Sequence, residues 1–224
     1  MKKTVIKIFI FLLSIIVIGI IYIFYYNYQA GIITNGDKIP EYDSVRSALL
    51  IVDIQEATTG SVSVTEQYIQ KSESLIKKIN EIIKFAEANN ILIVYIYTES
   101  SNWFINLLND TMEKGKPGTH LDSRLNIVSE NILSKEKMDS FSNPDLDVLL
   151  IKNNISKIYF VGLDPAYCIN NTTTAAQIRG YRCYHIEDAI ISETDELKNE
   201  MLEKFKSSGV SLINMTEFLG ANSQ

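Results

Sequence analysis

Several short stretches of this sequence are apolar throughout, and they limit the chain to a small set of folds. Ser47–Asp53 reads SALLIVD, Ile91–Tyr97 reads ILIVYIY, and Ile158–Val161 reads IYFV. Continuous apolar runs are typical of strands that are covered on both faces, as in parallel sheets. Between the first two runs, Thr65–Asn89 has apolar residues at helical spacing among lysines and glutamates. Strands that alternate with helices predict a parallel sheet with helices on both faces.

The remaining segments continue the same alternation. Further strands are expected at Asn131–Ser134, Cys183–Ile186 and Val210–Ile213, and further helices from Asn143 onward, after Cys168 and near Glu196–Lys206. Pro144 suits the first turn of its helix, in which the residues expected to face inward are Leu146, Val148, Leu149 and Leu150. We therefore predict a three-layer, Rossmann-like α/β fold with a mostly parallel, six-stranded sheet.

The N-terminal 30 residues do not fit this pattern. Ile8–Tyr26 is an uncharged run of 19 residues. As a helix it would be roughly 28 Å long, close to the thickness of a bilayer hydrocarbon core of about 30 Å. Lys2, Lys3 and Lys7 precede the run, so the positive-inside rule keeps the N-terminus in the cytoplasm and exports the remainder. A cleaved signal peptide is the alternative, although its apolar region is usually shorter and no A-x-A site follows the run.

We therefore expect residues 1–30 to be a single-pass anchor in the cell membrane, residues 31–44 a short tether, and residues 45–224 one extracytoplasmic domain. The first 30 residues contain three lysines and no acids, so the remainder carries 18 basic and 27 acidic residues, a net charge of −9. This charge argues against nucleic acid or anionic lipid as a partner. Cys168 and Cys183 are the only cysteines, which leaves a single bridge between them open in an exported domain.

The segment Lys157–Ala176 carries the strongest indication of chemistry. Its apolar run stops at Gly162, and Cys168 follows at the start of a helical pattern. A cysteine in this position lies at the carboxyl edge of the sheet, where the free N–H groups and the dipole of a helix favour thiolate over thiol. Such a position suits a nucleophile, and a buried structural cysteine is the alternative.

Two further reactive side chains are expected at the same edge of the sheet. Asp53 ends the first apolar run, and Lys135 follows the strand at Asn131–Ser134. In open α/β sheets, ligands bind outside the carboxyl ends of the strands. A thiol, a carboxylate that can accept its proton and a cation that stabilises anions form a nucleophilic set.

The order and spacing of these residues resemble those of the isochorismatase-like cysteine hydrolases, a superfamily that includes nicotinamidases and N-carbamoyl amidohydrolases. Four motifs of that family are matched in order, over about residues 46–214. The first motif is the strand ending in D-x-Q, at Leu49–Gln55, and the second is a lysine followed by Phe and Leu, at Lys135, Phe141 and Leu146. The third motif is the nucleophile loop, at Gly162, Cys168, Ile169 and Thr172. The fourth is a later segment, at Arg179–Tyr181 and Glu187–Ala189.

The resemblance implies a catalytic triad of Asp53, Lys135 and Cys168. It also implies a cis peptide between Leu163 and Asp164, which turns the backbone amides of Asp164 and Cys168 into an oxyanion hole. Asp53 would take the thiol proton, Lys135 would hold the charged cluster together, and the thiolate would attack an amide carbonyl to give a thioester that water hydrolyses. We expect the substrate pocket to involve Gln55, Trp103, Phe141, Leu163 and Tyr167.

Nicotinamidases bind a metal through an Asp-x-His pair and further histidines after the second strand, and this chain has no histidine there. His120 is expected in a loop and His185 in a strand, so we expect neither a metal site nor another cofactor. Nicotinamidase activity itself is therefore disfavoured. Family members that hydrolyse the vinyl ether of isochorismate lack the nucleophilic cysteine, so the resemblance favours amide chemistry at Cys168.

Other positions depart from the family pattern. Pro165 and Ala166 replace the usual Thr-Asp of the nucleophile loop, and Glu56–Thr59 replaces an aromatic residue that often follows D-x-Q. Two functions stay open as a result. One is a membrane-anchored cysteine hydrolase that cleaves a small-molecule amide, and the other is an inactive module for binding or assembly on the same fold. The sequence also leaves self-association into a homo-oligomer open.

Overall fold

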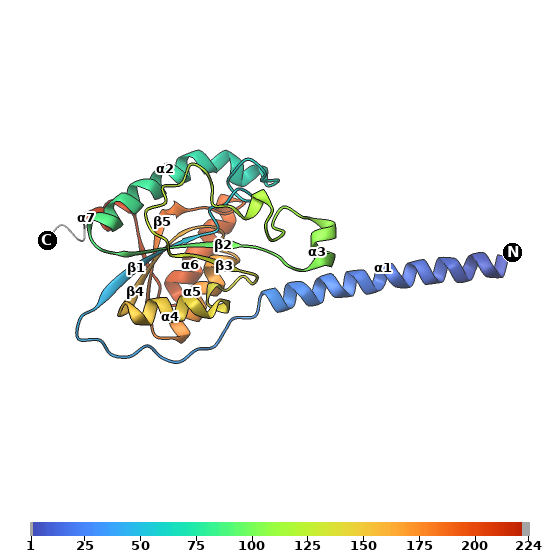
Figure 1. Cartoon of the computed structure of the whole chain (residues 1–224), viewed down its shortest axis with the longest axis horizontal. Coiled ribbons are helices and arrows are strands. Elements are labelled where there is room, and N and C mark those ends of the chain that lie inside the picture. Colours follow the sequence, from blue (N-terminus) through green and yellow to red (C-terminus); the bar gives the residue numbers. More distant parts are fainter. Residues whose placement is uncertain (1, 221–224) are drawn as a thin grey trace.

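The computed structural model of the protein describes residues 2–220, which form a layered domain and one long helix that extends from it (Figure 1). This helix, α1, comprises Lys2–Ala30. The sheet has six strands in the order β3-β2-β1-β4-β5-β6, and every neighbouring pair is parallel. The strands are β1 (Arg46–Val52), β2 (Leu92–Thr98), β3 (Ile132–Lys135), β4 (Ile155–Gly162), β5 (Arg182–Ile190) and β6 (Ser211–Ile213).

Strand β1 shows why the apolar runs are continuous. It lies in the middle of the sheet, and successive side chains of a strand point to opposite faces. Ala48, Leu50 and Val52 belong to one buried cluster, whereas Leu49 and Ile51 belong to the cluster on the other face. Both faces are covered, so each of these positions has to be apolar. The predicted α/β architecture with a parallel sheet is confirmed.

Helices form the two outer layers. The helices of the domain are α2 (Glu66–Ala88), α3 (Trp103–Leu108), α4 (Pro144–Lys152), α5 (Cys168–Ile178), α6 (Asp195–Ser207) and α7 (Met215–Gly220), with short 3-10 turns η1 (Pro117–Thr119) and η2 (Ser140–Ser142). Helices α2 and α7 cover one face of the sheet, for example through Ile79 and Phe218. Helices α4, α5 and α6 cover the other face, for example through Ile169 and Phe205.

Three local features differ from the sequence predictions. Helix α3 forms in the polar and aromatic stretch after β2, and it begins at Asn102, whose side chain accepts hydrogen bonds from two backbone N–H groups. Helix α7 was not predicted, although it buries Phe218 fully. The prediction that Val148 faces inward is wrong, because this side chain is 63% exposed. Only Leu146 and Leu150, one helical turn apart, are buried in α4.

The strand order reverses between β1 and β4, and this reversal is where a ligand site is expected in such a sheet. The carboxyl ends of β1 to β4 bring Asp53, Thr98, Lys135 and the loop after Gly162 to one edge. Gly162 has a φ of 114°, and a Cβ atom at this position would collide with the carbonyl oxygen of Val52. Only glycine therefore lets β4 end this close to β1.

Residues 31–44 contain no helix or strand, but they lie along the domain (Figure 1). Ile39 donates its N–H to a backbone carbonyl at the end of α5, at 2.8 Å. Thr34 donates to Oδ2 of Asp139 through its N–H at 2.8 Å and through its hydroxyl at 2.6 Å. The carbonyl oxygen of Ala30 accepts the N–H of Met138 at 2.9 Å. These contacts hold the end of α1 next to the carboxyl edge of the sheet.

Helix α1 is long and apolar enough to cross a membrane over its 28 residues from Lys3 to Ala30, and its most apolar part is not buried against the domain. A signal sequence near an N-terminus has the same length and composition. The helix thus fits both alternatives that the sequence leaves open.

Candidate active site

Asp53, Lys135 and Cys168 meet at the carboxyl edge of the sheet. The Nζ atom of Lys135 lies 2.9 Å from Oδ2 of Asp53 and 3.2 Å from Sγ of Cys168. Asp53 directly follows β1, Lys135 ends β3, and Cys168 begins α5. Asp53 and Lys135 are 4% and 3% exposed, whereas Cys168 is partly exposed. The structure brings together the three residues that the sequence nominates and leaves the thiol as the most accessible of them.

Thr98, at the end of β2, completes this cluster and was missed in the sequence. Its hydroxyl donates to Oδ1 of Asp53 at 2.9 Å and accepts a hydrogen bond from Nζ of Lys135 at 2.5 Å. The three protons of the ammonium group therefore each have an acceptor, on Asp53, Thr98 and Cys168. In the sequence, the one indication of Thr98 is that it directly follows the second apolar run, Ile91–Tyr97.

The turn after β1 fixes the direction of Asp53. Asp53 has a φ of 55°, in the left-handed region that few non-glycine residues adopt, and its N–H donates to the carbonyl oxygen of Ile96 at 2.8 Å. Gln55 is fully buried, and its amide group bonds the backbone of Thr98 and the carbonyl oxygen of Gly118. The prediction that Gln55 lines the pocket is wrong, since its side chain ties the turn to β2 instead.

The surroundings of Cys168 favour its neutral form. Burial and the Asp53 carboxylate raise the pKa of the Cys168 thiol to about 12, and Lys135 opposes them only in part. Burial alone would lower the pKa of Lys135, but Asp53 and Cys168 hold it above its ordinary value. Burial and the charge of Asp53 both act against the prediction that the helix start favours a thiolate. A thiol at this position needs a base before it can attack.

The loop between β4 and α5 forms the other side of the site. The peptide between Leu163 and Asp164 is cis, as the family resemblance implies. The buried Asp164 carboxylate accepts hydrogen bonds from the hydroxyls of Tyr68 at 2.9 Å and Ser192 at 2.7 Å. It also accepts the N–H of Ala166 at 2.7 Å. These bonds order the loop although Pro165 and Ala166 depart from the family pattern.

Two backbone donors of this loop are free. Within residues 2–220, the N–H groups of Asp164 and Cys168 donate to no protein acceptor. A pair of unpaired N–H groups next to a nucleophile is what an oxyanion hole requires. The same two groups are those that the resemblance implies.

A cavity of about 250 Å³ reaches Cys168. Its walls come from the end of α1 (Tyr26, Ala30), the segment after β2 (Ile105, Met112) and the segment after β3 (Glu136, Met138). The volume lies slightly below the roughly 300–1,000 Å³ that is usual for ligand pockets. The cavity therefore suits a small group next to the sulfur.

Four more residues expected at the pocket lie elsewhere. Phe141 and Leu163 are buried, at 3% and 2% exposure, and Phe141 packs against Tyr181 and the guanidinium group of Arg179. Trp103 and Tyr167 are 73% and 46% exposed, and neither lines the cavity at Cys168. These predictions are wrong because α1 and the segment after β2 supply much of the wall, and no local sequence pattern indicates their approach.

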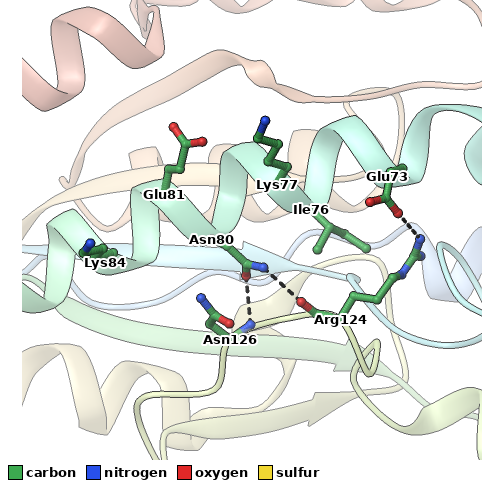
Figure 2. Close-up of a pocket in the computed structure, with 8 residues that line it drawn as sticks. All are labelled: Glu73, Ile76, Lys77, Asn80, Glu81, Lys84, Arg124 and Asn126. Atoms are coloured by element: carbon green, nitrogen blue, oxygen red, sulfur yellow. Dashed lines mark hydrogen bonds and ion pairs between the residues drawn. The ribbon is translucent and has the colours of Figure 1, made fainter.

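A larger cavity, of about 400 Å³, lies along α2 (Figure 2). Its polar groups largely pair with one another: Asn80 bonds the backbone of Arg124 and Asn126, and the Arg124 side chain bonds Glu73 at 3.2 Å (Figure 2). None of the residues that contact Lys135 lines this cavity. The smaller cavity is therefore the candidate active site.

A metal site of the kind implied for nicotinamidases does not fit this chain. Among residues 2–220, no group of three or more His, Cys, Asp and Glu side chains could share an ion. His120 is exposed in a loop. His185 is fully buried in β5 between Phe160 and Phe205 and lies 2.9 Å from the Thr173 hydroxyl, and burial lowers its pKa to about 3.

Comparisons with known proteins agree with this geometry. A family model described as the Isochorismatase domain matches residues 47–217. An isochorismatase-like hydrolase from Alkaliphilus metalliredigens has a TM-score of 0.71 and 20% identity, over 79% of this chain and 99% of its own. N-carbamoylsarcosine amidase from Thermoplasma acidophilum has a TM-score of 0.64 and 20% identity, over 76% and 97% of the two chains.

Pyrazinamidase of Pyrococcus horikoshii, solved in complex with zinc, also has a TM-score of 0.64, with 24% identity over 75% of this chain and 99% of its own. The family match covers the sheet except for Arg46 and contains Asp53, Thr98, Lys135, Asp164 and Cys168, whereas α1 lies outside it. The chain therefore belongs to the isochorismatase family, within the isochorismatase-like hydrolase superfamily.

Proposed function

We propose that the protein is a membrane-anchored cysteine hydrolase that cleaves the C–N bond of a small amide through a thioester on Cys168. The observation that carries this proposal is the contact of one buried ammonium, that of Lys135, with both the Asp53 carboxylate and the Cys168 thiol. The shared fold of the two amidases named above adds support. An inactive binding module is the weaker alternative, because it gives no reason to bury this charged cluster beside a cavity.

The first step starts from the thiol form of Cys168. As Sγ attacks the amide carbon and a C–S bond forms, Asp53 accepts the thiol proton. Lys135 stays protonated throughout, since its pKa is held above its ordinary value, and it balances the negative charge first on Asp53 and then on the sulfur. The hydroxyl of Thr98 bonds Oδ1 of Asp53 and limits rotation of the carboxylate.

The attack of Sγ on the amide carbon gives a tetrahedral intermediate, which collapses in the second step. The amide oxygen becomes an oxyanion, which accepts hydrogen bonds from the free N–H groups of Asp164 and Cys168. The C–N bond then breaks, and the proton on Asp53 passes to the leaving nitrogen. Water next attacks the thioester, Asp53 accepts its proton, and the sulfur leaves as the thiol when that proton is returned. Asp53 therefore acts as base and then as acid in each half of the reaction.

We propose further that α1 remains attached and that the domain lies outside the cytoplasm. The three lysines at the start of the chain give this orientation. Retention of the helix is supported by the cavity, whose wall includes Tyr26 and Ala30 at the end of α1. Cleavage after the apolar run would remove part of this wall, so a signal peptide fits the site less well.

The nucleophile is tested by two cysteine variants of the full-length protein in detergent micelles. Cys168→Ala should lower kcat by roughly 10³-fold or more, because the attacking atom is lost. The matched variant Cys183→Ala removes a sulfur from the core, so it should keep turnover and lower the free energy of unfolding by about 1 kcal/mol. Release of p-nitroaniline from acyl p-nitroanilides measures turnover. A Cys168→Ala variant as active as the parent would contradict the proposal, and amide binding without turnover by the parent would favour the binding module.

The role of Asp53 is tested by Asp53→Asn. This change should lower the pKa of Cys168, because Asp53 raises that pKa and Lys135 then acts on the thiol without opposition. Turnover should still fall by about 10²–10⁴-fold, since the base is lost. The pKa is read from the pH dependence of Cys168 alkylation by iodoacetamide, followed by mass spectrometry. Glu130→Gln removes the same charge from an exposed position and should change neither quantity.

For Asp53→Asn, an unchanged or raised pKa of Cys168 would show that Asp53 does not act on the thiol. Full turnover in this variant would remove Asp53 from the mechanism.

The anchor and its orientation are tested in cells. The intact chain should sediment with membranes, and protease added outside the cell should degrade an epitope at its C-terminus. Recovery of a soluble form that begins near Gly31 would identify a signal peptide. Protection of the C-terminal epitope in intact cells would reverse the orientation.

A further inference from the structure

Helix α3 lies next to α1 (Figure 1), and it exposes apolar side chains. Trp103, Leu107 and Leu108 are 73%, 74% and 60% exposed, in a helix of only six residues. No part of the domain among residues 2–220 covers them. Clustered apolar side chains of this kind on a surface mark a contact with a partner or a membrane.

The position of α3 is fixed by contacts with α1. Nδ2 of Asn102 donates to the hydroxyl of Tyr22 at 2.7 Å. The rings of Tyr22 and Phe104 meet edge to face, with their centroids 5.2 Å apart. Phe104 also reaches Gly19, where its ring lies 3.5 Å from the place that a Cβ atom would occupy.

These contacts place α3 along the apolar run of α1. Gly19 precedes Tyr26, the last residue of that run, by seven positions. At a rise of 1.5 Å per residue, Phe104 therefore lies about 10 Å below the end of the run. Amphipathic helices that lie in a membrane surface insert to about 5–10 Å. If α1 spans a membrane, α3 must lie in the boundary between headgroups and acyl chains.

The same two helices form a wall of the active-site cavity. Tyr26 and Ala30 of α1 and Ile105 of α3 line the space that reaches Cys168. Ile105 thus belongs to the cavity, whereas Trp103 and Leu107 of the same helix are exposed. Helix α3 therefore contributes both to the wall of the cavity that reaches Cys168 and to the exposed apolar surface.

We infer that α3 docks into the membrane surface and that the site takes an amphiphilic amide, whose apolar chain stays in the bilayer while its amide group enters the cavity. This inference rests on the proposed hydrolase function and specifies its substrate class. The small cavity agrees with it, because only the amide group and its immediate neighbours need to fit. The acidic domain disfavours anionic headgroups, so a zwitterionic membrane is the expected surface.

Trp103 is the only tryptophan of the chain, so its fluorescence reports on α3 alone. The full-length protein is placed in phosphatidylcholine vesicles whose acyl chains carry bromine near the headgroup end. Emission should fall at least about two-fold relative to unbrominated vesicles, and soluble iodide should quench it weakly, because an interfacial tryptophan contacts lipid. Efficient quenching by iodide with no effect of bromine would overturn the docking of α3. Protection from both quenchers would also overturn it, since a protein partner or second copy would then cover the surface.

The substrate class is tested with decanoyl and acetyl p-nitroanilide in plain phosphatidylcholine vesicles. The parent should prefer the decanoyl amide, and Leu107→Asn/Leu108→Asn should lower the decanoyl-to-acetyl ratio of kcat/KM by about ten-fold, because α3 then leaves the surface. The vesicles are the same for both proteins, so partitioning of the amides into the lipid is unchanged. Helix α1 still anchors the variant, so the enzyme also stays at the vesicle. The matched control Val148→Asn/Ile151→Asn alters two exposed apolar residues of α4 and should keep the ratio.

An equal ratio in the parent and in the α3 variant would overturn the substrate class. The fluorescence result does not depend on turnover. If bromine quenches Trp103 and neither amide is hydrolysed, the docking of α3 stands and the proposed hydrolase function fails.

Discussion

The ammonium group of Lys135 is the interaction on which the rest of the site depends. It donates to a carboxylate, a hydroxyl and a thiol that lie on three different segments. Strand register makes this possible, because Thr98 and Lys135 are paired neighbours in β2 and β3 and Asp53 follows the adjacent strand β1. Removing one partner of a buried ion pair usually lowers the free energy of unfolding by about 3–5 kcal/mol. The stability of this part of the sheet edge therefore depends on the charge of Lys135.

Two residues of the candidate site could be predicted because they follow strands. Asp53 and Lys135 each end an apolar or strand-like run, and parallel strands that start at one edge end at the other. Thr98 obeys the same rule, but a threonine in a strand is too common to stand out. The protonation of Cys168 could not be predicted from its helix start, since burial and the charge of Asp53 depend on the assembled fold.

The pocket was the least predictable part, because its walls come from segments far apart in the sequence. Asn102 bonds Tyr22 across 80 positions, and Asn171 bonds the carbonyl oxygen of Gly31 across 140. No periodicity or motif encodes such contacts. They also mean that the end of α1 is part of the cavity wall, since residues 31–44 lie along the domain and bring it there. In this protein, an isochorismatase-family domain shares a wall of its cavity with a candidate membrane span.

The proposed reaction requires Cys168 to form a covalent bond with the acyl part of an amide. This bond can be detected by mass spectrometry of the full-length protein, quenched in acid during turnover of an acyl p-nitroanilide. We expect an adduct with the mass of the acyl group on the peptide that contains Cys168, because the thioester precedes attack by water. Turnover with no adduct under rapid quenching, or an adduct on another residue, would contradict it.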